Sequence, residues 1–166
     1  MKKRIISMVT VLSLIFCLLF TSIIDVKASN HNQEKIDGSY LTMEETSKGS
    51  TNSGISTRGI HLMDGECSIT KAGVGRIYVY ASTTGNHDVD YISTVIYVDQ
   101  YNEKDDAWDQ IDAWQVEDVN TYYVSTSKYM MVDRGYYYRV HADHVVKKGS
   151  DPYEEATTLT DGIFIN

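Results

Sequence analysis

The fold of this chain is decided near its C-terminal end by the stretch GYYYRVHA, residues 135–142, together with LTDGIFI, residues 159–165. Aromatic and β-branched residues dominate both stretches, and a polar turn separates them. Such residues fit the pleated, half-buried surface of a sheet. The two stretches are therefore predicted to be the last two strands of an antiparallel β-sandwich.

The spacing within the first stretch favours a particular kind of sandwich. Gly135 is followed by Tyr138, Val140 and Ala142, which is typical of the penultimate strand in immunoglobulin-like and fibronectin-type domains. A tyrosine near the start of that strand turns its hydroxyl back to the corner backbone. Tyr138 is predicted to have this role, with Tyr136 as the alternative.

Similar runs of β-branched and aromatic residues recur from Gly59 onward, separated by glycine, asparagine and aspartate. This spacing is typical of an all-β sandwich or barrel. No stretch of ten residues keeps a helical apolar period, which excludes βαβ units and the ligand sites that they build. We expect one antiparallel immunoglobulin-like sandwich of about seven strands over residues 59–166.

The N-terminal residues have the three parts of a secretory signal peptide. Met1–Arg4 is basic, Ile5–Phe20 is almost wholly apolar, and small residues precede the bond between Ala28 and Ser29. The alternative, an uncleaved anchor helix, is disfavoured because a span needs about 20 apolar residues. We expect cleavage after Ala28, secretion, and no membrane span in the mature chain.

The mature chain is acidic and nearly free of cysteine. Removal of residues 1–28 takes away four of 15 basic and one of 23 acidic side chains, which leaves 11 and 22 and a net charge of −11. This charge disfavours nucleic acid and anionic membranes as partners. Cys67 is the one cysteine left, so we expect a buried thiol, with an intermolecular disulfide as the alternative.

Residues 29–58 are rich in serine, threonine, asparagine, glycine and charged residues. Such a composition buries too little apolar surface to offset the entropy of ordering. We expect a flexible polar leader. Tyr40–Glu45 could form a docking strand or a helical turn, but a solvated linker is favoured.

The polar residues point to no catalytic or metal site. His141 and His144 lie three apart, and on a strand they point to opposite faces, so a shared metal is not expected. An acidic group near a predicted hairpin lacks the EF-hand pattern and fits a solvated turn better than a Ca²⁺ site; it comprises Asp105, Asp106, Asp109 and Asp112. The G-x-S-x-G elbow of hydrolases is absent. We expect no cofactor and no enzymatic activity.

Aromatic residues give the one signal of binding, with 13 tyrosines and two tryptophans. Exposed aromatic rings on a sheet face suit stacking on a sugar or a protein partner. The candidate ligand-facing residues are Tyr78, Tyr80, Trp108, Trp114 and Tyr137. The alternative is that tyrosines simply fit a half-buried pleated face.

Trp108 and Trp114 share one parity in their strand, whereas Ile111 and Ala113 take the other. Either both faces of this strand carry apolar residues, or a bulge shifts the register.

An ordered series of short motifs covers nearly the whole mature chain. It comprises Tyr40-Leu41-Thr42, Arg58-Gly59, Gly73-x-Gly75, Val89-Asp90-x-Ile92, the Trp108 and Trp114 pair, Gly135-x-Tyr137-Tyr138-Arg139-Val140, His144, and Thr158-x-Thr160-Asp161-Gly162-Ile163. This series resembles an uncharacterised family of short secreted β-rich proteins from Gram-positive bacteria, known only as a domain of unknown function. The resemblance implies a secreted β domain and carries no known activity.

Four polar residues in the last strands form the remaining candidate set: Tyr138, His144, Glu154 and Thr160. Sheet pairing of the last two strands could bring the last three together, and we expect a structural hydrogen-bond set. The leading functional expectation is a secreted, non-catalytic binding module for an extracellular protein or glycan. The alternatives are a small secreted hydrolase or toxin-like effector, and a surface component that self-associates through its strand edges.

Overall fold

The computed structural model describes residues 35–51 and 59–166. These residues belong to one compact unit, Gln33–Asn166. The expected signal peptide and its cleavage site between Ala28 and Ser29 lie outside the described residues. Within the described ranges, no helix has the length and apolar character needed to cross a membrane.

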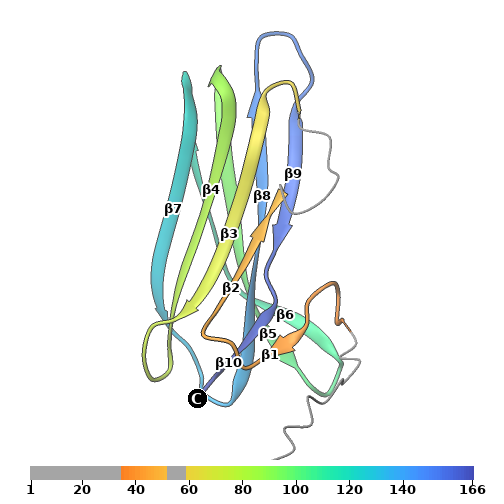
Figure 1. The fold of residues 1–166 in the computed structure, drawn as a ribbon, viewed down its shortest axis with the longest axis vertical. Coiled ribbons are helices and arrows are strands. Elements are labelled where there is room, and N and C mark those ends of the chain that lie inside the picture. The colour runs from red at the N-terminus through yellow and green to blue at the C-terminus, as the bar shows by residue number, and fades with distance from the viewer. Residues whose placement is uncertain (1–34, 52–58) are drawn as a thin grey trace, which may run out of the picture. The chain divides into compact units, whose positions relative to one another are not determined.

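The described chain folds into ten strands in two sheets (Figure 1). The first sheet holds, in spatial order, β2 (Thr46–Ser50), β3 (Leu62–Lys71), β4 (Arg76–Val89) and β7 (Thr121–Met131). The second sheet holds β1 (Leu41–Thr42), β10 (Gly162–Ile165), β8 (Tyr136–Lys147), β5 (Tyr91–Asn102) and β6 (Ala107–Asp118), and β9 (Glu154–Leu159) also pairs with β8. The all-β expectation is confirmed.

The connections interlock the two sheets. Strands β2 and β3, β3 and β4, β5 and β6, and β8 and β9 are consecutive antiparallel pairs within one sheet, whereas the chain changes sheet after β1, after β4, after β6 and after β7. As a result β4 lies beside β7 in one sheet, and β5 lies beside β8 in the other. Among the strands of the described residues, only β1 pairs in parallel, with β10.

Alternation along the strands builds the core between the sheets. In β4, Ile77, Val79 and Ala81 are fully buried, while Tyr78 and Tyr80 between them are half-exposed. Residues from the second sheet meet this face in one cluster, which includes Ile96, Val98, Val140, Ala142, Ile163 and Ile165. Full burial of such a side chain contributes about 1.5–3 kcal/mol, so this contact between the sheets is the main source of stability.

The strand count differs from the expected seven for two reasons. The last strand is interrupted, because β9 and β10 pair with the same edge of β8 on either side of Thr160-Asp161. The residues before Gly59 add β1 and β2. Counting β9 and β10 as one strand and setting β1 and β2 aside leaves seven.

The expectation of a wholly flexible leader over residues 29–58 is wrong for its described part. Leu41–Thr42 pairs with β10, and Thr46–Ser50 pairs with β3. Main-chain ladder bonds and hydroxyl contacts hold this segment, so its order does not require the apolar residues that it lacks. The expected domain start at Gly59 therefore leaves out residues that belong to the compact unit.

A bulge in β6 explains the conflicting parity of its tryptophans. Val98 pairs with Asp112 and Asp99 pairs with Gln110, so Ile111 is an extra residue. The register shift turns Trp114 toward the core, where it pairs with Ile96, and leaves Trp108 on the opposite face. The bulge was one of the two alternatives that the sequence left open.

Tyr138 forms the corner contact that its spacing predicts. Its ring is buried, and its hydroxyl donates a 2.8 Å hydrogen bond to the carbonyl of Asp133, five residues earlier. Burial raises the pKa of Tyr138 to about 12. The contact fixes the turn that carries the chain from β7 in the first sheet to β8 in the second.

Replacing Tyr138 with phenylalanine removes this hydrogen bond and leaves the Asp133 carbonyl without its donor. We expect the free energy of unfolding to fall by about 1–2 kcal/mol, with an unchanged denaturant m-value, in urea titrations. The matched control is Tyr136→Phe, because Tyr136 is 44% exposed. Equal stability of the Tyr138→Phe and Tyr136→Phe variants would contradict the corner role.

Candidate functional site

His144 is the centre of a buried polar cluster between the two sheets. Its side chain has no exposed surface; Nδ1 lies 2.9 Å from the Thr83 hydroxyl, and Nε2 lies 2.8 Å from the Thr158 hydroxyl. Thr83 also contacts the Thr94 hydroxyl at 2.5 Å and donates to the Ser93 carbonyl. Both ring nitrogens are therefore engaged inside the protein.

Gly65 shows how closely the first sheet packs on this ring. A Cβ at residue 65 would lie 2.3 Å from the His144 imidazole, so only glycine fits there. Burial lowers the pKa of His144 to about 4, so the ring is neutral at pH 7. A neutral, enclosed imidazole with both nitrogens occupied is a structural group and cannot take a proton from an outside substrate.

Glu154 binds the backbone at the start of β3. Its carboxylate accepts hydrogen bonds from the amides of Ile60 (2.9 Å), His61 (2.9 Å) and Leu62 (2.6 Å). Burial opposes ionisation, but the three backbone donors outweigh it and hold the pKa of Glu154 below its ordinary value. The carboxylate fixes the chain where it enters the first sheet.

Thr160 has a separate role at the interruption between β9 and β10. Its hydroxyl accepts a 2.9 Å hydrogen bond from the Val140 amide, and its own amide donates to the Val140 carbonyl. None of these contacts involves His144 or Glu154. The structure therefore places His144, Glu154 and Thr160 in three separate hydrogen-bond groups.

Sequence reasoning missed a fourth polar group, at the end of the molecule where β3 begins. His61 Nδ1 lies 3.1 Å from His87 Nε2, and His61 Nε2 lies 2.9 Å from the Asp151 carboxylate. His87 Nδ1 donates to the carbonyl of Asp88. The irregular stretch of β4 after Thr84 carries His87 to this place. Neither the spacing nor the periodicity of the sequence signals such a contact.

This histidine group has no nucleophile among its partners. Within residues 35–51 and 59–166, the hydrogen bonds of the two rings go to each other, to Asp151 and to the Asp88 carbonyl. The Asp88 carbonyl can only accept, so His87 Nδ1 donates to it, and the contacts of His61 with His87 and with Asp151 join three segments of the chain. The group is therefore a structural clamp between the start of β3, the end of β4 and the β8–β9 connection.

Cys67 lies in the core with 1% of its surface exposed. Its thiol points to the Val140 carbonyl at 3.8 Å, and burial raises the pKa of Cys67 to about 11. The protonated, enclosed thiol is unreactive. This matches burial, the first of the two expectations for this residue.

The five candidate aromatic residues fall into three places. Trp114 lies at the seam between β6 and β7, where its Nε1 donates to the Thr126 hydroxyl and the Lys128 ammonium lies 4.9 Å from the ring centre. Trp108 and Tyr137 lie on the second sheet, where the Tyr137 ring is 5.1 Å from that of Phe164. Tyr78 and Tyr80 lie on the first sheet.

The outer face of the first sheet forms a continuous polar and aromatic surface, which we call the tyrosine face. Pairing of β3, β4 and β7 sets its members side by side: Ser68, Thr70, Tyr78, Tyr80, Tyr123, Ser125, Ser127 and Tyr129. The Tyr78 and Tyr129 rings are 4.8 Å apart, and the Tyr80 and Tyr123 hydroxyls are 2.9 Å apart. Tyr129 is 59% exposed.

One end of the tyrosine face carries additional side chains suited to binding. The Arg76 guanidinium lies 4.4 Å from the centre of the Tyr129 ring. Met131 pairs with Arg76 and is 74% exposed. Arginine, methionine and tyrosine are enriched in protein–protein interfaces, so this end has the composition of a contact surface.

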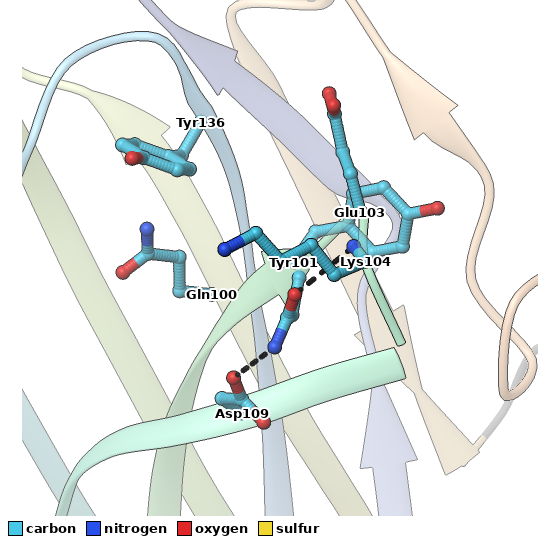
Figure 2. Close-up of a pocket in the computed structure, with 7 residues that line it drawn as sticks. Gln100, Tyr101, Glu103, Lys104, Asp109 and Tyr136 are labelled. Atoms are coloured by element: carbon cyan, nitrogen blue, oxygen red, sulfur yellow. Dashed lines mark hydrogen bonds between the residues drawn. The ribbon is translucent and has the colours of Figure 1, made fainter. Parts of the chain in front are cut away.

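A second candidate surface is the hollow at the end of the β5–β6 hairpin, shown in Figure 2. It has a volume of about 460 Å³. The Lys104 ammonium reaches toward Gln100 and Tyr136 across this space. Among residues 35–51 and 59–166, the side chains of these three residues have no hydrogen-bonding partner, so their donors and acceptors are available to a ligand.

The hairpin beneath this hollow is held by its own hydrogen bonds. The side-chain amide nitrogen of Asn102 donates to the carboxylates of Asp105 and Asp109, both at 2.9 Å. The side-chain oxygen of Asn102 accepts from the backbone amide of Lys104. The Tyr101 hydroxyl donates to Asp106 at 2.6 Å. Much of the acidic cluster in the sequence is thus a hydrogen-bonded turn.

No family model and no curated protein matches the chain, so neither supplies a function that could be transferred to it.

The pKa of His144 predicts a dependence of stability on pH. A histidine in the unfolded chain titrates near 6.5, so between pH 6.5 and 4 the unfolded state binds more protons than the folded state. The free energy of unfolding should therefore fall as the pH is lowered through this window, by roughly 3 kcal/mol in total from this residue.

Long-range ¹H–¹⁵N NMR spectra of the imidazoles test this directly. The His144 resonances should keep the pattern of a neutral ring down to about pH 4. The same chain unfolded in urea is the control. A His144 titration near pH 6.5 in the folded protein would show that the ring is not enclosed.

Proposed function

We propose that the chain is a secreted, non-catalytic binding module that contacts an extracellular protein through the tyrosine face. The observation that carries this proposal is the set of four neighbouring tyrosines, Tyr78, Tyr80, Tyr123 and Tyr129, among short hydroxyl side chains on one open sheet face. Tyrosine supplies a large amphipathic contact at low entropic cost, and serine supplies adaptable hydrogen bonds.

The four-stranded extent of the face favours a protein over a small ligand as partner. A pleated four-stranded sheet offers a broad surface, and specific protein interfaces cover about 800 Å² on each side. Arg76, Tyr129 and Met131 would form the energetic centre, since arginine and tyrosine dominate interface hot spots. The acidic mature chain would add selectivity for a neutral or basic partner surface.

We propose an immunoglobulin-like fold, supported by the interlocked β4–β7 and β5–β8 pairs and by the Tyr138 corner. Secretion through a signal peptide, and membership of the secreted family that the sequence resembles, rest on the sequence motifs alone. A hydrolase is less well supported, because the buried His144 and Cys67 are closed to substrates.

The double variant Tyr78→Ser, Tyr129→Ser tests the proposed surface. We expect the wild-type protein to bind at least one member of an array of purified extracellular and cell-surface proteins saturably. The double variant should weaken that binding at least about 30-fold, as expected for loss of a hot spot.

The control is Tyr153→Ser, a change of similar size at a residue that is 58% exposed and outside both sheets. This variant should bind as the wild type does. If the double variant folds and binds with unchanged affinity, the tyrosine face is not the contact surface.

A second candidate function is saccharide binding at the hollow of the β5–β6 hairpin. The unpartnered Gln100 amide, Lys104 ammonium and Tyr136 ring provide the hydrogen-bonding groups and the apolar face that a sugar ring requires. The acidic charge of the chain favours a neutral saccharide over an anionic one.

For this site we expect saturable binding of a neutral oligosaccharide on a glycan array. The double variant Gln100→Ala, Tyr136→Ala should abolish it with little change in stability, because the two side chains make no hydrogen bond in the described structure. The tyrosine-face double variant is the matched control and should retain binding. Loss of glycan binding in that control instead would place the saccharide on the first sheet.

A further inference from the structure

The N-terminal segment, defined here as residues 36–42, is bound on the outer side of the second sheet much as a peptide ligand would be. A tight turn at Asp37 and Gly38, both with positive φ, brings Ile36 and Ser39 into mutual backbone hydrogen bonds. The segment then pairs with β10 through β1. In Figure 1, β1 lies beside β10 at the end of the molecule away from the β8–β9 connection.

Arg139 is the central residue of the surface that receives this segment. Its Nε donates to Asp99 at 3.0 Å, and its Nη1 contacts the carbonyl of Asp37 at 3.0 Å and the hydroxyl of Ser39 at 3.2 Å. The guanidinium lies 4.5 Å from the centre of the Trp108 ring. Trp108 donates from its indole nitrogen to the carbonyl of Ile36 at 3.0 Å.

The interruption between β9 and β10 supplies the other contacts. Asp161 accepts a 2.9 Å hydrogen bond from the Tyr40 amide, and the Gly162 amide donates 2.8 Å to the Tyr40 carbonyl. The Ser39 hydroxyl donates 2.7 Å to the Thr160 carbonyl. We define the acceptor site as Trp108, Arg139, Thr160, Asp161 and Gly162.

Most of these bonds go to main-chain atoms of the segment. Of its side chains, only Ser39 is fully buried, whereas Tyr40 is 38% exposed and Met43, just beyond it, is 67% exposed. Binding through the main chain with little apolar burial is typical of strand addition at a sheet edge. An element held mainly by polar contacts opens at a lower free energy than the core.

We propose that the acceptor site is a peptide-binding site that can take the N-terminal segment of a second copy of this chain in place of its own. The fit argues for a second copy, because the site receives the Asp37-Gly38 turn and the Ser39 hydroxyl of this sequence specifically. Met43 and Glu44 link β1 to β2 without strand pairing of their own, so they can act as the hinge for the exchange.

The chain's own N-terminal segment competes with a free peptide for the acceptor site. Its effective concentration is high, in the millimolar range for a short linker. A free peptide should therefore bind the wild-type chain poorly and bind well once the chain's own segment is weakened. Gly38→Val achieves this without altering the acceptor site, because residue 38 has a φ of +87° and a Cβ there would lie 3.0 Å from Leu159.

The experiment measures binding of a fluorescent synthetic peptide of residues 35–44 to the full chain by anisotropy. The Gly38→Val chain should bind it at least about tenfold more tightly than the wild-type chain does. The same peptide carrying Gly38→Val is the matched control and should bind neither chain. Adding Trp108→Phe to the Gly38→Val chain removes the indole donor to Ile36 and should weaken peptide binding.

Native mass spectrometry of the wild-type chain at high concentration gives the second readout. Two wild-type copies can exchange their segments reciprocally, so a dimer should form that the Gly38→Val chain, whose segment fits neither site, does not form. The wild-type dimer should disappear when excess peptide of residues 35–44 is added. Tyr40→Pro, which removes the amide donor to Asp161, replaces Gly38→Val if that variant does not fold. Equal binding of both peptides, or no binding by a folded variant, would overturn the proposal.

Discussion

The last strand of the sandwich is interrupted at Thr160-Asp161, and the positions of β1 and β2 depend on this irregularity. Leu159 pairs with His141 and Ile163 pairs with Tyr138, so four steps along the last strand match three along β8. The extra residue breaks the ladder and frees main-chain groups at the edge. The Ser39 hydroxyl and the Tyr40 carbonyl take two of these groups, and the Ser47 hydroxyl accepts from the Asp161 amide. Both β1 and β2 are thereby tied to one point.

Close packing around Thr160-Asp161 requires glycine at two neighbouring positions. A Cβ at Gly162 would lie 2.4 Å from the Trp108 ring, and a Cβ at Gly49 would meet the Leu159 carbonyl. The buried Arg139–Asp99 pair sits beside it, where burial opposes ionisation of Asp99 but His141 and Arg139 together lower its pKa. Removal of one partner from such a pair costs about 3–5 kcal/mol. Across the described residues, every buried side-chain nitrogen and oxygen has a partner.

The sequence was sufficient for features that depend on local pattern. Alternation of apolar residues predicted the core strands, and the spacing from Gly135 to Tyr138 predicted the corner. It was insufficient where tertiary contacts replace apolar burial. The N-terminal segment is held by hydroxyls, main-chain groups and Arg139, and such contacts produce no periodic apolar pattern in the sequence. His61 and His87 meet through an irregular stretch of β4. The bulge residue Ile111 is the reason that Trp108 and Trp114 lie on opposite faces of β6.

We propose that the N-terminal segment is a separable element bound to an interrupted strand, and native-state hydrogen exchange measured by NMR tests this most directly. The amides of Thr160 and Gly162 lie two residues apart, but the first donates to Val140 of β8 and the second to Tyr40 of the segment. We predict that the Gly162 amide exchanges through an opening of clearly lower free energy than the Thr160 amide does. Equal protection of the two amides, at the level of global unfolding, would contradict it.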